Sequence, residues 1–438
     1  MRPSRRDLLL QSAALLGAPR FAFGQGTGGA DAKHLIVVFA EGGWDVTYGL
    51  DPKLSCIATD GGPCAIQGPE LDEDRSNPDD REAVQTFGSI PVVVNDVKRP
   101  NVRAFFERWH GRSHVVNGVW TGSIAHDPCR TRLLTGTPDG THADLATIAG
   151  YTFGGALPLG SVDLSGWSIA GPLASSTGRL GFHSQIAALI DDGSSFRAPA
   201  GVGFEYPLFD LDPTDEASVE TFVRSRVDAL RSRFSDGGGR NDRVLDDLLV
   251  SMDRGDRFRD RSQEILASLR LGIETSFTEQ LGMAVDLIEA GLCHAVTIDT
   301  REEWDTHSAN VTQHTSYDRT FAGLSALLAD LEGRAMLDQV VVAVISEMTR
   351  TPLRNSADGK DHWGHTSAML LGAVRGDATS GRTTELLESE PMNLATGEVD
   401  PNGELCKYDN LCAGILELAG VDPGDWLPGV QPFRGASA

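Results

Sequence analysis

The chain has few basic residues, and it has no long apolar run beyond its first segment. It contains 38 Lys and Arg against 62 Asp and Glu, which gives a formal net charge of −24 over 438 residues. Nucleic-acid binding needs clustered Lys and Arg against phosphates, so this balance argues against a nucleic-acid partner. A membrane-spanning helix needs about 20 consecutive apolar residues, so we expect no transmembrane segment. The acidic charge is compatible with a soluble exported protein and with divalent cations.

Cysteine is also scarce, and its spacing excludes common cysteine motifs. The chain has six cysteines and no CxxC pair, which argues against zinc-knuckle and thioredoxin-like sites. Cys56 and Cys64 flank a loop rich in Gly and Pro, while Cys406 and Cys412 flank a predicted helix start. We expect each pair to form a disulfide, as in an oxidising compartment. The other two cysteines are expected to be buried thiols: Cys129 and Cys293.

The first residues resemble an export signal. Arg5 and Arg6 precede Leu8–Leu10 and a short apolar stretch, which is typical of a twin-arginine signal peptide over residues 1–24. An amphipathic N-terminal helix is the alternative. The signal predicts the twin-arginine translocase as a partner and a periplasmic or secreted location. Residues 25–438 are then expected to form a single domain.

Apolar runs rich in β-branched residues alternate with helical patterns. Nearly continuous apolar character is typical of strands covered on both faces of a sheet. Helical spacing runs from Phe277 to Ile288 and from Tyr317 to Leu331. The alternation predicts an α/β fold, a three-layer α/β/α sandwich with a mostly parallel central sheet. The predicted strands cover residues 34–40, 113–119, 294–299 and 339–346.

Two regions interrupt this alternation. Residues 51–95 are rich in Gly, Pro and Asp, and we expect an exposed loop there. Residues 212–270 are dense in charge and contain a helical pattern from Val223 to Phe234, which predicts a helical lid or insertion. The oligomeric state does not follow from the sequence.

Side chains that bind metals follow the predicted strands. Ligands of open parallel sheets bind beyond the carboxyl ends of the strands. These carboxylates and imidazoles lie far apart in the sequence, yet they could meet at that edge. Such ligands suit Zn²⁺, Mn²⁺, Fe or Ca²⁺. We therefore expect one or two divalent cations at these residues: Asp45, Asp305, His307, Asp361, His362 and His365.

Structural interpretations of the same residues remain open. Asp45 could cap a helix after a tight turn. Asp305 and His307 could form a hydrogen-bonded pair at the surface. His126 could make hydrogen bonds at a helix start, and His314, among Thr, Ser and Gln, could be solvated.

The ordered motifs resemble a known family. "GGWD", the segment from His126 to Gly136, "WDTH", "SEMTRTP" and "DHWGH" occur in this order. Together they look like the exported domain-of-unknown-function-1501 family, itself similar to the alkaline phosphatase and sulfatase superfamily. The resemblance covers roughly residues 33–375. It implies an alkaline phosphatase-like fold and a two-metal hydrolase, whose substrate is a small-molecule or polymeric ester of phosphate or sulfate.

The resemblance also implies roles for single residues. Arg350 would clamp an oxyanion through two hydrogen bonds, which a lysine could not do. The alternative is a buried ion pair between Glu347 and Arg350. One metal would be held by Asp45, Asp361 and His362, and the other by Asp305 and His307, completed by His365 or His314.

One departure from the superfamily concerns the nucleophile. The superfamily places a Ser or Thr at a helix start, where related chains often read "SH" and this chain reads Ala125-His126. Ser123 or Thr121 would then substitute, or water would attack directly. Otherwise the chain is a non-catalytic metal-binding or cell-surface assembly protein. The catalytic candidates are His126, Ser123 and Arg350.

Overall fold

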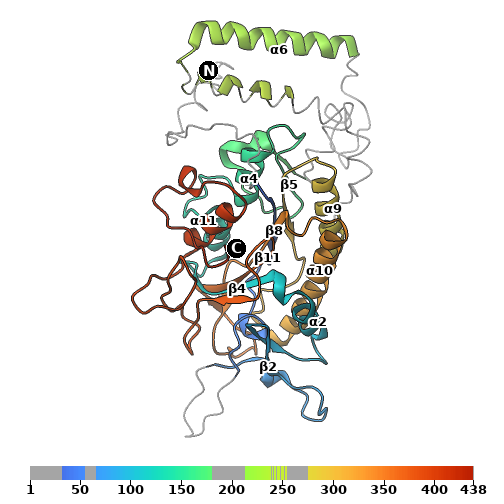
Figure 1. Ribbon diagram of the computed structural model, residues 1–438, viewed down its shortest axis with the longest axis vertical. Helices are drawn as coiled ribbons and strands as arrows, with labels where there is room; N and C mark the ends of the chain where they lie inside the picture. The colour runs from blue at the N-terminus through green and yellow to red at the C-terminus, as the bar shows by residue number, and fades with distance from the viewer. Residues whose placement is uncertain are drawn as a thin grey trace, which may run out of the picture.

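The fold is built on one large mixed sheet (Figure 1). The computed structural model describes residues 32–54, 66–179 and 275–437, together with most of 213–253. Within these residues the sheet has eight strands in the order β12-β4-β11-β8-β1-β7-β5-β6. Their bounds are β1 His34–Phe39, β4 Ser113–Trp120, β5 Ser161–Asp163, β6 Thr177–Arg179, β7 Ala295–Asp299, β8 Val340–Ile345, β11 His365–Gly372 and β12 Ala378–Ser380.

All but one of these strands run in the same direction. β1 is parallel to β7 and β8, β5 is parallel to β6 and β7, and β12 is parallel to β4. β11 runs antiparallel to its neighbours β4 and β8. The predicted mostly parallel sheet is confirmed. The predicted strands agree with β1, β4, β7 and β8 to within one residue at each end.

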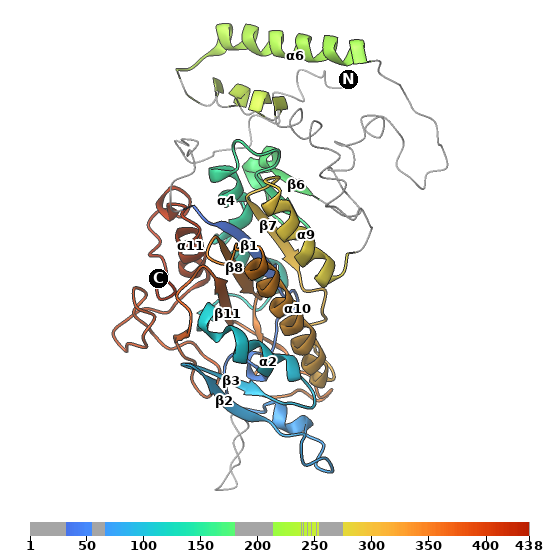
Figure 2. The same ribbon diagram turned by 45° about the vertical axis from the view of Figure 1, so that its right-hand side comes forward.

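Helices cover both faces of the sheet (Figure 2). Ile36 and Val38 of β1 pack into the core under one helical layer, while Leu35 and Val37 point to the core under the other. This alternation confirms the three-layer sandwich. The first layer contains α2 Pro100–Trp109, α9 Phe277–Glu289 and α10 Gln313–Gly333, and the second contains α3 His126–Thr135, α4 Leu145–Phe153 and α11 Tyr408–Leu418.

Short elements join these layers. The short 3-10 helices in the described residues are η1 Val46–Tyr48, η2 Pro69–Asp72, η3 His110–Arg112, η4 Gly171–Ser176, η6 Asn310–Thr312 and η7 Pro423–Asp425. A two-stranded pair, β9 Thr349–Arg350 and β10 His362–Trp363, lies between β8 and β11 in the sequence.

The expected exposed loop over residues 51–95 is wrong for its second half. β2 Ala83–Phe87 and β3 Ile90–Val94 form an antiparallel hairpin. Ile90, Val92 and Val94 are buried in the core under α2 and α10. The β-branched run of β3 outweighs the Gly and Pro around it, because its side chains have apolar surface to cover.

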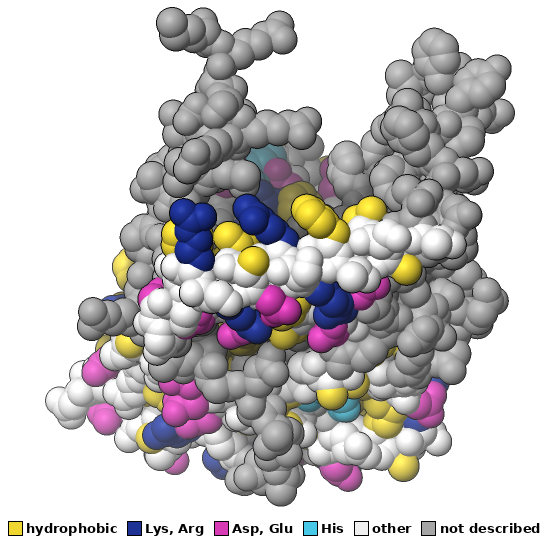
Figure 3. Space-filling model, turned by 90° about the horizontal axis from the view of Figure 1, so that it is seen from above, with side chains coloured by type: hydrophobic (Ala, Val, Ile, Leu, Met, Phe, Trp, Pro, Cys, Tyr) yellow, Lys and Arg dark blue, Asp and Glu magenta, His cyan; other side chains and the backbone are white. Residues whose placement is uncertain are grey.

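The charged insertion contains a long helix, α6 Pro213–Phe234, which includes the predicted pattern. Figure 3 looks down on α6 and shows Lys or Arg beside hydrophobic side chains along it. Val219, Phe222 and Phe234 are each about half exposed or more. Within the part of the chain that the structure describes, no helix is long and apolar enough to cross a membrane.

The predicted disulfide between Cys406 and Cys412 is wrong, because both are free and buried. The Cys406 carbonyl accepts a hydrogen bond from Trp120 N (2.8 Å), at the end of β4. The Cys412 thiol on α11 instead faces the Leu133 carbonyl of α3 at 3.3 Å. The free, buried thiols expected at the other two positions are confirmed: Cys129 and Cys293. The predicted signal and the Cys56–Cys64 pair lie outside the described residues.

Candidate metal centre

Five polar side chains meet where the parallel strands end. His126 is the first residue of α3, which follows β4, and Glu347 comes two residues after β8. Asp305 and His307 lie in the segment after β7, and His362 is in β10, just before β11 begins. Because β11 runs antiparallel, its amino end lies at the same edge as the carboxyl ends of the other strands. The topology thus brings together residues that are up to 236 positions apart, from His126 to His362.

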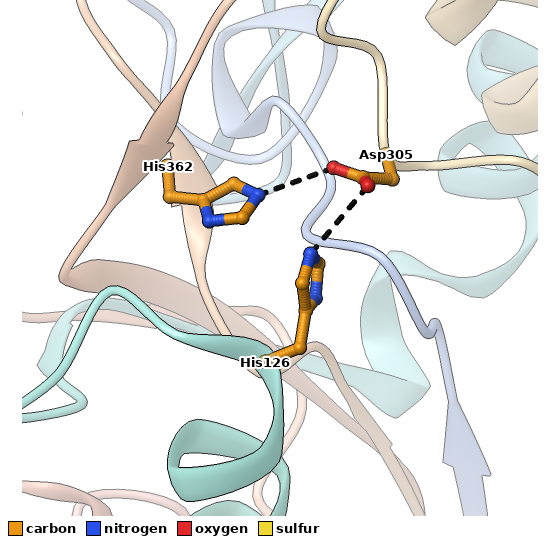
Figure 4. A group of neighbouring side chains, drawn as sticks. All are labelled: His126, Asp305 and His362. Carbon is orange, nitrogen blue, oxygen red and sulfur yellow. Dashed lines mark hydrogen bonds and ion pairs between the residues drawn. The ribbon is translucent and has the colours of Figure 1, made fainter.

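Three imidazoles point one nitrogen each toward the Asp305 carboxylate. His362 Nε2 lies 3.2 Å from Asp305 Oδ1, and His307 Nε2 lies 3.2 Å from the same oxygen. His126 Nε2 lies 3.5 Å from Asp305 Oδ2. Figure 4 shows His126, Asp305 and His362 facing one another; their ligand atoms lie within 4.8 Å of one another. This is the spacing of a single cation site.

The second nitrogen of each ring faces a hydrogen-bond acceptor. With the ring proton on Nδ1, the Nε2 lone pair is left free, as it is in histidines that bind metals. The contacts are His126 Nδ1 to Glu347 Oε1 (2.9 Å), His307 Nδ1 to Asp361 Oδ1 (3.0 Å) and His362 Nδ1 to the Ile124 carbonyl (2.8 Å).

The same arrangement makes a cation favourable at the centre. His307 Nε2 and His362 Nε2 are only 2.9 Å apart. If both Nδ1 atoms carry the proton, two lone pairs face each other across this gap, so a cation or an added proton is needed between them. The residues present therefore fit a divalent cation.

Arg350 fixes the carboxylate of the centre. Its side chain is fully buried, and Nη2 donates to Asp305 Oδ1 at 2.6 Å. Burial acts to raise the pKa of Asp305, but the hydrogen bond and charge of Arg350, together with the hydrogen bond from His362, outweigh it and the pKa lies below its usual value. The other donors reach the carbonyls of Gly42, Gly43 and Lys360. The predicted oxyanion clamp is therefore wrong: the guanidinium is already used inside the protein.

Glu347 fixes His126 in the same way. It is fully buried, accepts a hydrogen bond from Gly42 N at 2.7 Å, and raises the pKa of His126 through its own hydrogen bond. Glu41 completes a second group of ligand atoms with His126 and Glu347, again within 4.8 Å of one another. Burial, followed by the charge of Glu347, raises the pKa of Glu41. Sequence reasoning missed Glu41, although its position directly after the first predicted strand was a usable signal.

Asp45 lies outside the centre, and its predicted role as a ligand is wrong. It caps η1, and its Oδ1 accepts hydrogen bonds from Thr47 N (3.2 Å) and Thr47 Oγ1 (2.7 Å). Its Oδ2 lies 2.7 Å from Lys360 Nζ and accepts from Asn310 Nδ2 at 2.9 Å. Both Asp45 and Lys360 are fully buried. The capping alternative is therefore correct, with a buried ion pair added to it.

Two other predicted histidine ligands are also placed elsewhere. His365 Nδ1 lies 2.6 Å from Ser389 Oγ. His314 is buried on α10, 2.7 Å from Arg99 Nη1 and 3.4 Å from Asp72 Oδ2, so it is neither a ligand of this centre nor solvated. Each has polar partners of its own. Asp361 is close to the centre, but its carboxylate faces the outer nitrogen of His307, Nδ1, at 3.0 Å.

The candidate nucleophiles make hydrogen bonds around the turn before α3. Ser123 Oγ accepts a hydrogen bond from Ala125 N at 3.2 Å. Thr121 Oγ1 donates to the carbonyls of Ser123 (2.9 Å) and Gly364 (3.0 Å). Both hydroxyls therefore serve the turn that leads into α3. Of the three catalytic candidates, His126 and Arg350 lie against the Asp305 carboxylate, while Ser123 bonds in the turn before α3.

A comparison of the chain with known family models shows which family it belongs to. A family model described as "Protein of unknown function (DUF1501)" matches residues 32–429. The chain belongs to this family. The match confirms the resemblance drawn from the ordered motifs, and it spans the sheet and every residue of the centre. No curated protein matches the chain.

This DUF1501 member is also similar to solved structures of hydrolases and a synthase. One is the lipoteichoic acid synthase LtaP from Listeria monocytogenes, with 8% identity, 93% of this chain and 77% of that chain covered, and a TM-score of 0.36. Another is the phosphonate monoester hydrolase SpPMH from Silicibacter pomeroyi, with 8% identity, 93% and 77% coverage, and a TM-score of 0.35. The PsFucS1 sulfatase from Pseudoalteromonas sp. has 10% identity, 93% and 73% coverage, and a TM-score of 0.33. At such scores the function of the chain must be argued from its own site.

Proposed function

We propose that the protein is a metal-dependent hydrolase of phosphate or sulfate esters. The observation that carries the proposal is the convergence of three Nε2 atoms on the Asp305 carboxylate, with every Nδ1 held by an acceptor. Such a set of three imidazoles and one carboxylate suits Zn²⁺, Mn²⁺ or Fe better than Ca²⁺, which prefers oxygen ligands alone.

The protein's own groups would hold the centre rigid during the reaction. When bound, a divalent cation supplies Lewis-acid polarisation of an ester oxygen. Arg350 orients Asp305, and the buried Glu347 orients His126. Such pre-orientation supports catalysis, because no reorganisation is needed when charge develops in the transition state.

We propose water as the nucleophile. The support is the hydrogen bonding of Ser123 and Thr121, whose hydroxyls are engaged in the turn before α3. Ser123→Ala and Thr121→Val should therefore each keep ester hydrolysis within about tenfold of wild type. Loss of an activated serine costs about a millionfold in a well-studied hydrolase. A loss on that scale in Ser123→Ala, with the metal retained, would restore serine catalysis.

The test of the function is hydrolysis of aryl phosphate and aryl sulfate by protein reconstituted with Zn²⁺ or Mn²⁺. We expect turnover that is lost with a chelator and in Asp305→Asn. Asp338→Asn is the matched control, because Asp338 is exposed and precedes β8 at the opposite edge of the sheet. Full metal occupancy without turnover on any such ester would contradict the proposal.

A non-catalytic metal-binding or cell-surface assembly protein is the second candidate. Ala125 favours it, because a hydroxyl is missing where the superfamily carries its nucleophile. The turnover assay on the reconstituted protein separates the two candidates. A binding protein would hold the metal and show no ester hydrolysis.

We also propose export through the twin-arginine translocase to the periplasm or beyond. The support is Arg5 and Arg6 before the apolar segment. Changing both residues to Lys should retain the precursor in the cytoplasm. Cell fractionation and immunoblotting measure the export. Unchanged export of this double variant would exclude this route.

A further inference from the structure

A pocket adjoins the metal centre and shares a wall with it. Its volume is about 310 Å³, and segment 351–355 lines it together with Asp361 and Leu386. Asp361 also accepts the hydrogen bond from His307 Nδ1. Asn355 Nδ2 donates to the His307 carbonyl (3.0 Å) and to Asp361 Oδ1 (3.2 Å). A molecule held at the centre would therefore have this pocket directly beside it.

The walls of the pocket expose apolar surface. Leu353 is 47% exposed and Leu386 is 48% exposed, and Pro352 lies beside them in the lining. Ile124, which is 60% exposed, adds apolar surface near the centre, since its carbonyl accepts from His362. Covering half-exposed leucines with an apolar group is favourable, because it removes apolar area from water.

The pocket offers no free positive charge among the described residues that line it. Arg354 is the lining cation, and its side chain is 7% exposed. Its guanidinium binds Asp72 Oδ1 at 2.8 Å and Asp358 Oδ1 at 2.9 Å. Asp361, by contrast, is negative and its side chain is 60% exposed. An anionic group in the pocket would meet this carboxylate without a compensating cation.

We infer that this pocket binds an uncharged, largely apolar alcohol portion of the ester, such as an aryl or short alkyl group. The inference rests on the proposed function, because it places the phosphate or sulfate at the metal centre. The size agrees: an engineered cavity of about 150 Å³ already accepts benzene, so about 310 Å³ holds one substituted ring. The pocket selects for apolar leaving groups and against charged ones.

Binding of stable phosphonates to the metal-loaded protein tests this selection without relying on turnover. Calorimetry would compare three probes: methylphosphonate, phenylphosphonate and 4-carboxyphenylphosphonate. We expect phenylphosphonate to bind at least about tenfold more tightly than methylphosphonate, since even one methylene in an apolar pocket is worth about tenfold or more. The carboxylated probe should bind more weakly than phenylphosphonate.

Substitutions in the pocket wall test whether the preference for phenylphosphonate comes from this pocket. In Leu353→Ser/Leu386→Ser the advantage of the phenyl group should fall below about threefold, with methylphosphonate binding unchanged. Leu248→Ser is the matched control, because Leu248 is 43% exposed and does not line the pocket. It should keep the full advantage. Both changes replace exposed side chains, so the fold should tolerate them.

Each failure has a different signature. Equal binding of methylphosphonate and phenylphosphonate, or tighter binding of the carboxylated probe, would overturn the pocket assignment and leave the metal centre standing. An unchanged phenyl advantage in the double variant would also overturn it. No binding of methylphosphonate to protein that holds its metal would overturn the proposed function, and the pocket assignment with it.

Discussion

His126 has two differently placed nitrogens, and the difference defines its role. Nδ1 faces the buried Glu347 carboxylate, and Nε2 faces Asp305. Glu347 itself is anchored by Gly42 N, in the turn after β1. The ring is thus held in one orientation by an element distant in sequence. An acceptor of this kind also increases the basicity of the imidazole toward a metal.

Glu347→Gln tests this positioning role. The amide can still accept from His126 Nδ1, but it lacks the negative charge. We expect metal affinity to fall about 10–100-fold, the range seen when such outer partners are changed. Competition with a chromophoric chelator would measure the dissociation constant. Glu332→Gln, at an exposed ion pair with Arg108, is the control; equal affinity in both variants would show that Glu347 does not act on the metal.

At the scale of elements, Lys360 connects the segment between β9 and β10 to neighbouring segments at this edge of the sheet. Lys360 N donates to the Thr306 carbonyl at 3.0 Å, and its carbonyl accepts from Arg350. Its ammonium pairs with Asp45 at the start of η1. One buried residue, through its backbone and its side chain, therefore connects three segments that carry or flank the centre.

Lys360→Met should be strongly destabilising, because it leaves the Asp45 charge buried without its partner. Removing one member of a buried pair costs about 3–5 kcal/mol in unfolding free energy. The double variant Asp45→Asn/Lys360→Met should recover part of that loss, since no uncompensated charge remains. Urea denaturation of Lys360→Met, Asp45→Asn and the double variant measures these losses of unfolding free energy. If the double variant loses as much as the two single variants lose together, the two side chains are not coupled.

Some elements could be predicted from the sequence and others could not, for physical reasons. Continuous apolar runs identify buried strands, which is why β1 and β8 were placed correctly. Such a run says nothing about direction, so the antiparallel course of β11 was not predicted. Asp45 stands at a strand end like a ligand, and only its partner Lys360, 315 positions away, shows otherwise. Three of the predicted metal-binding residues, which cluster around short motifs, do lie close together at this edge: Asp305, His307 and His362.

At the scale of the whole molecule, buried neutral histidines link stability to acid pH. His114 in β4 is 1% exposed, and burial lowers its pKa from 6.5 to about 4. Below pH 6.5 the unfolded chain takes up a proton that the native chain does not, so stability falls as the pH drops from 6.5 toward 4. The difference between the pKa of His114 in the unfolded and the native chain corresponds to a loss of about 3 kcal/mol of unfolding free energy. His294 has a pKa of about 4 for the same reason.

His114→Gln checks this linkage. Gln offers a donor for the Arg375 carbonyl and an acceptor for Ser380 Oγ, the two partners of the ring, but it does not titrate. Between pH 6.5 and 4 the variant should lose about 3 kcal/mol less unfolding free energy than wild type. Adding His294→Gln should flatten the dependence further. Parallel curves for wild type and His114→Gln would refute the linkage.

The central claim is that three imidazoles and Asp305 hold one divalent cation at the carboxyl edge of the sheet. Zinc X-ray absorption on the reconstituted full chain tests it most directly, together with the zinc content. We predict bound zinc with imidazole ligands at about 2.0–2.1 Å, fewer imidazoles in His307→Ala and in His362→Ala, and an unchanged spectrum in His365→Ala. Absence of bound zinc, or the same imidazole count in wild type and in both ligand variants, would contradict the account.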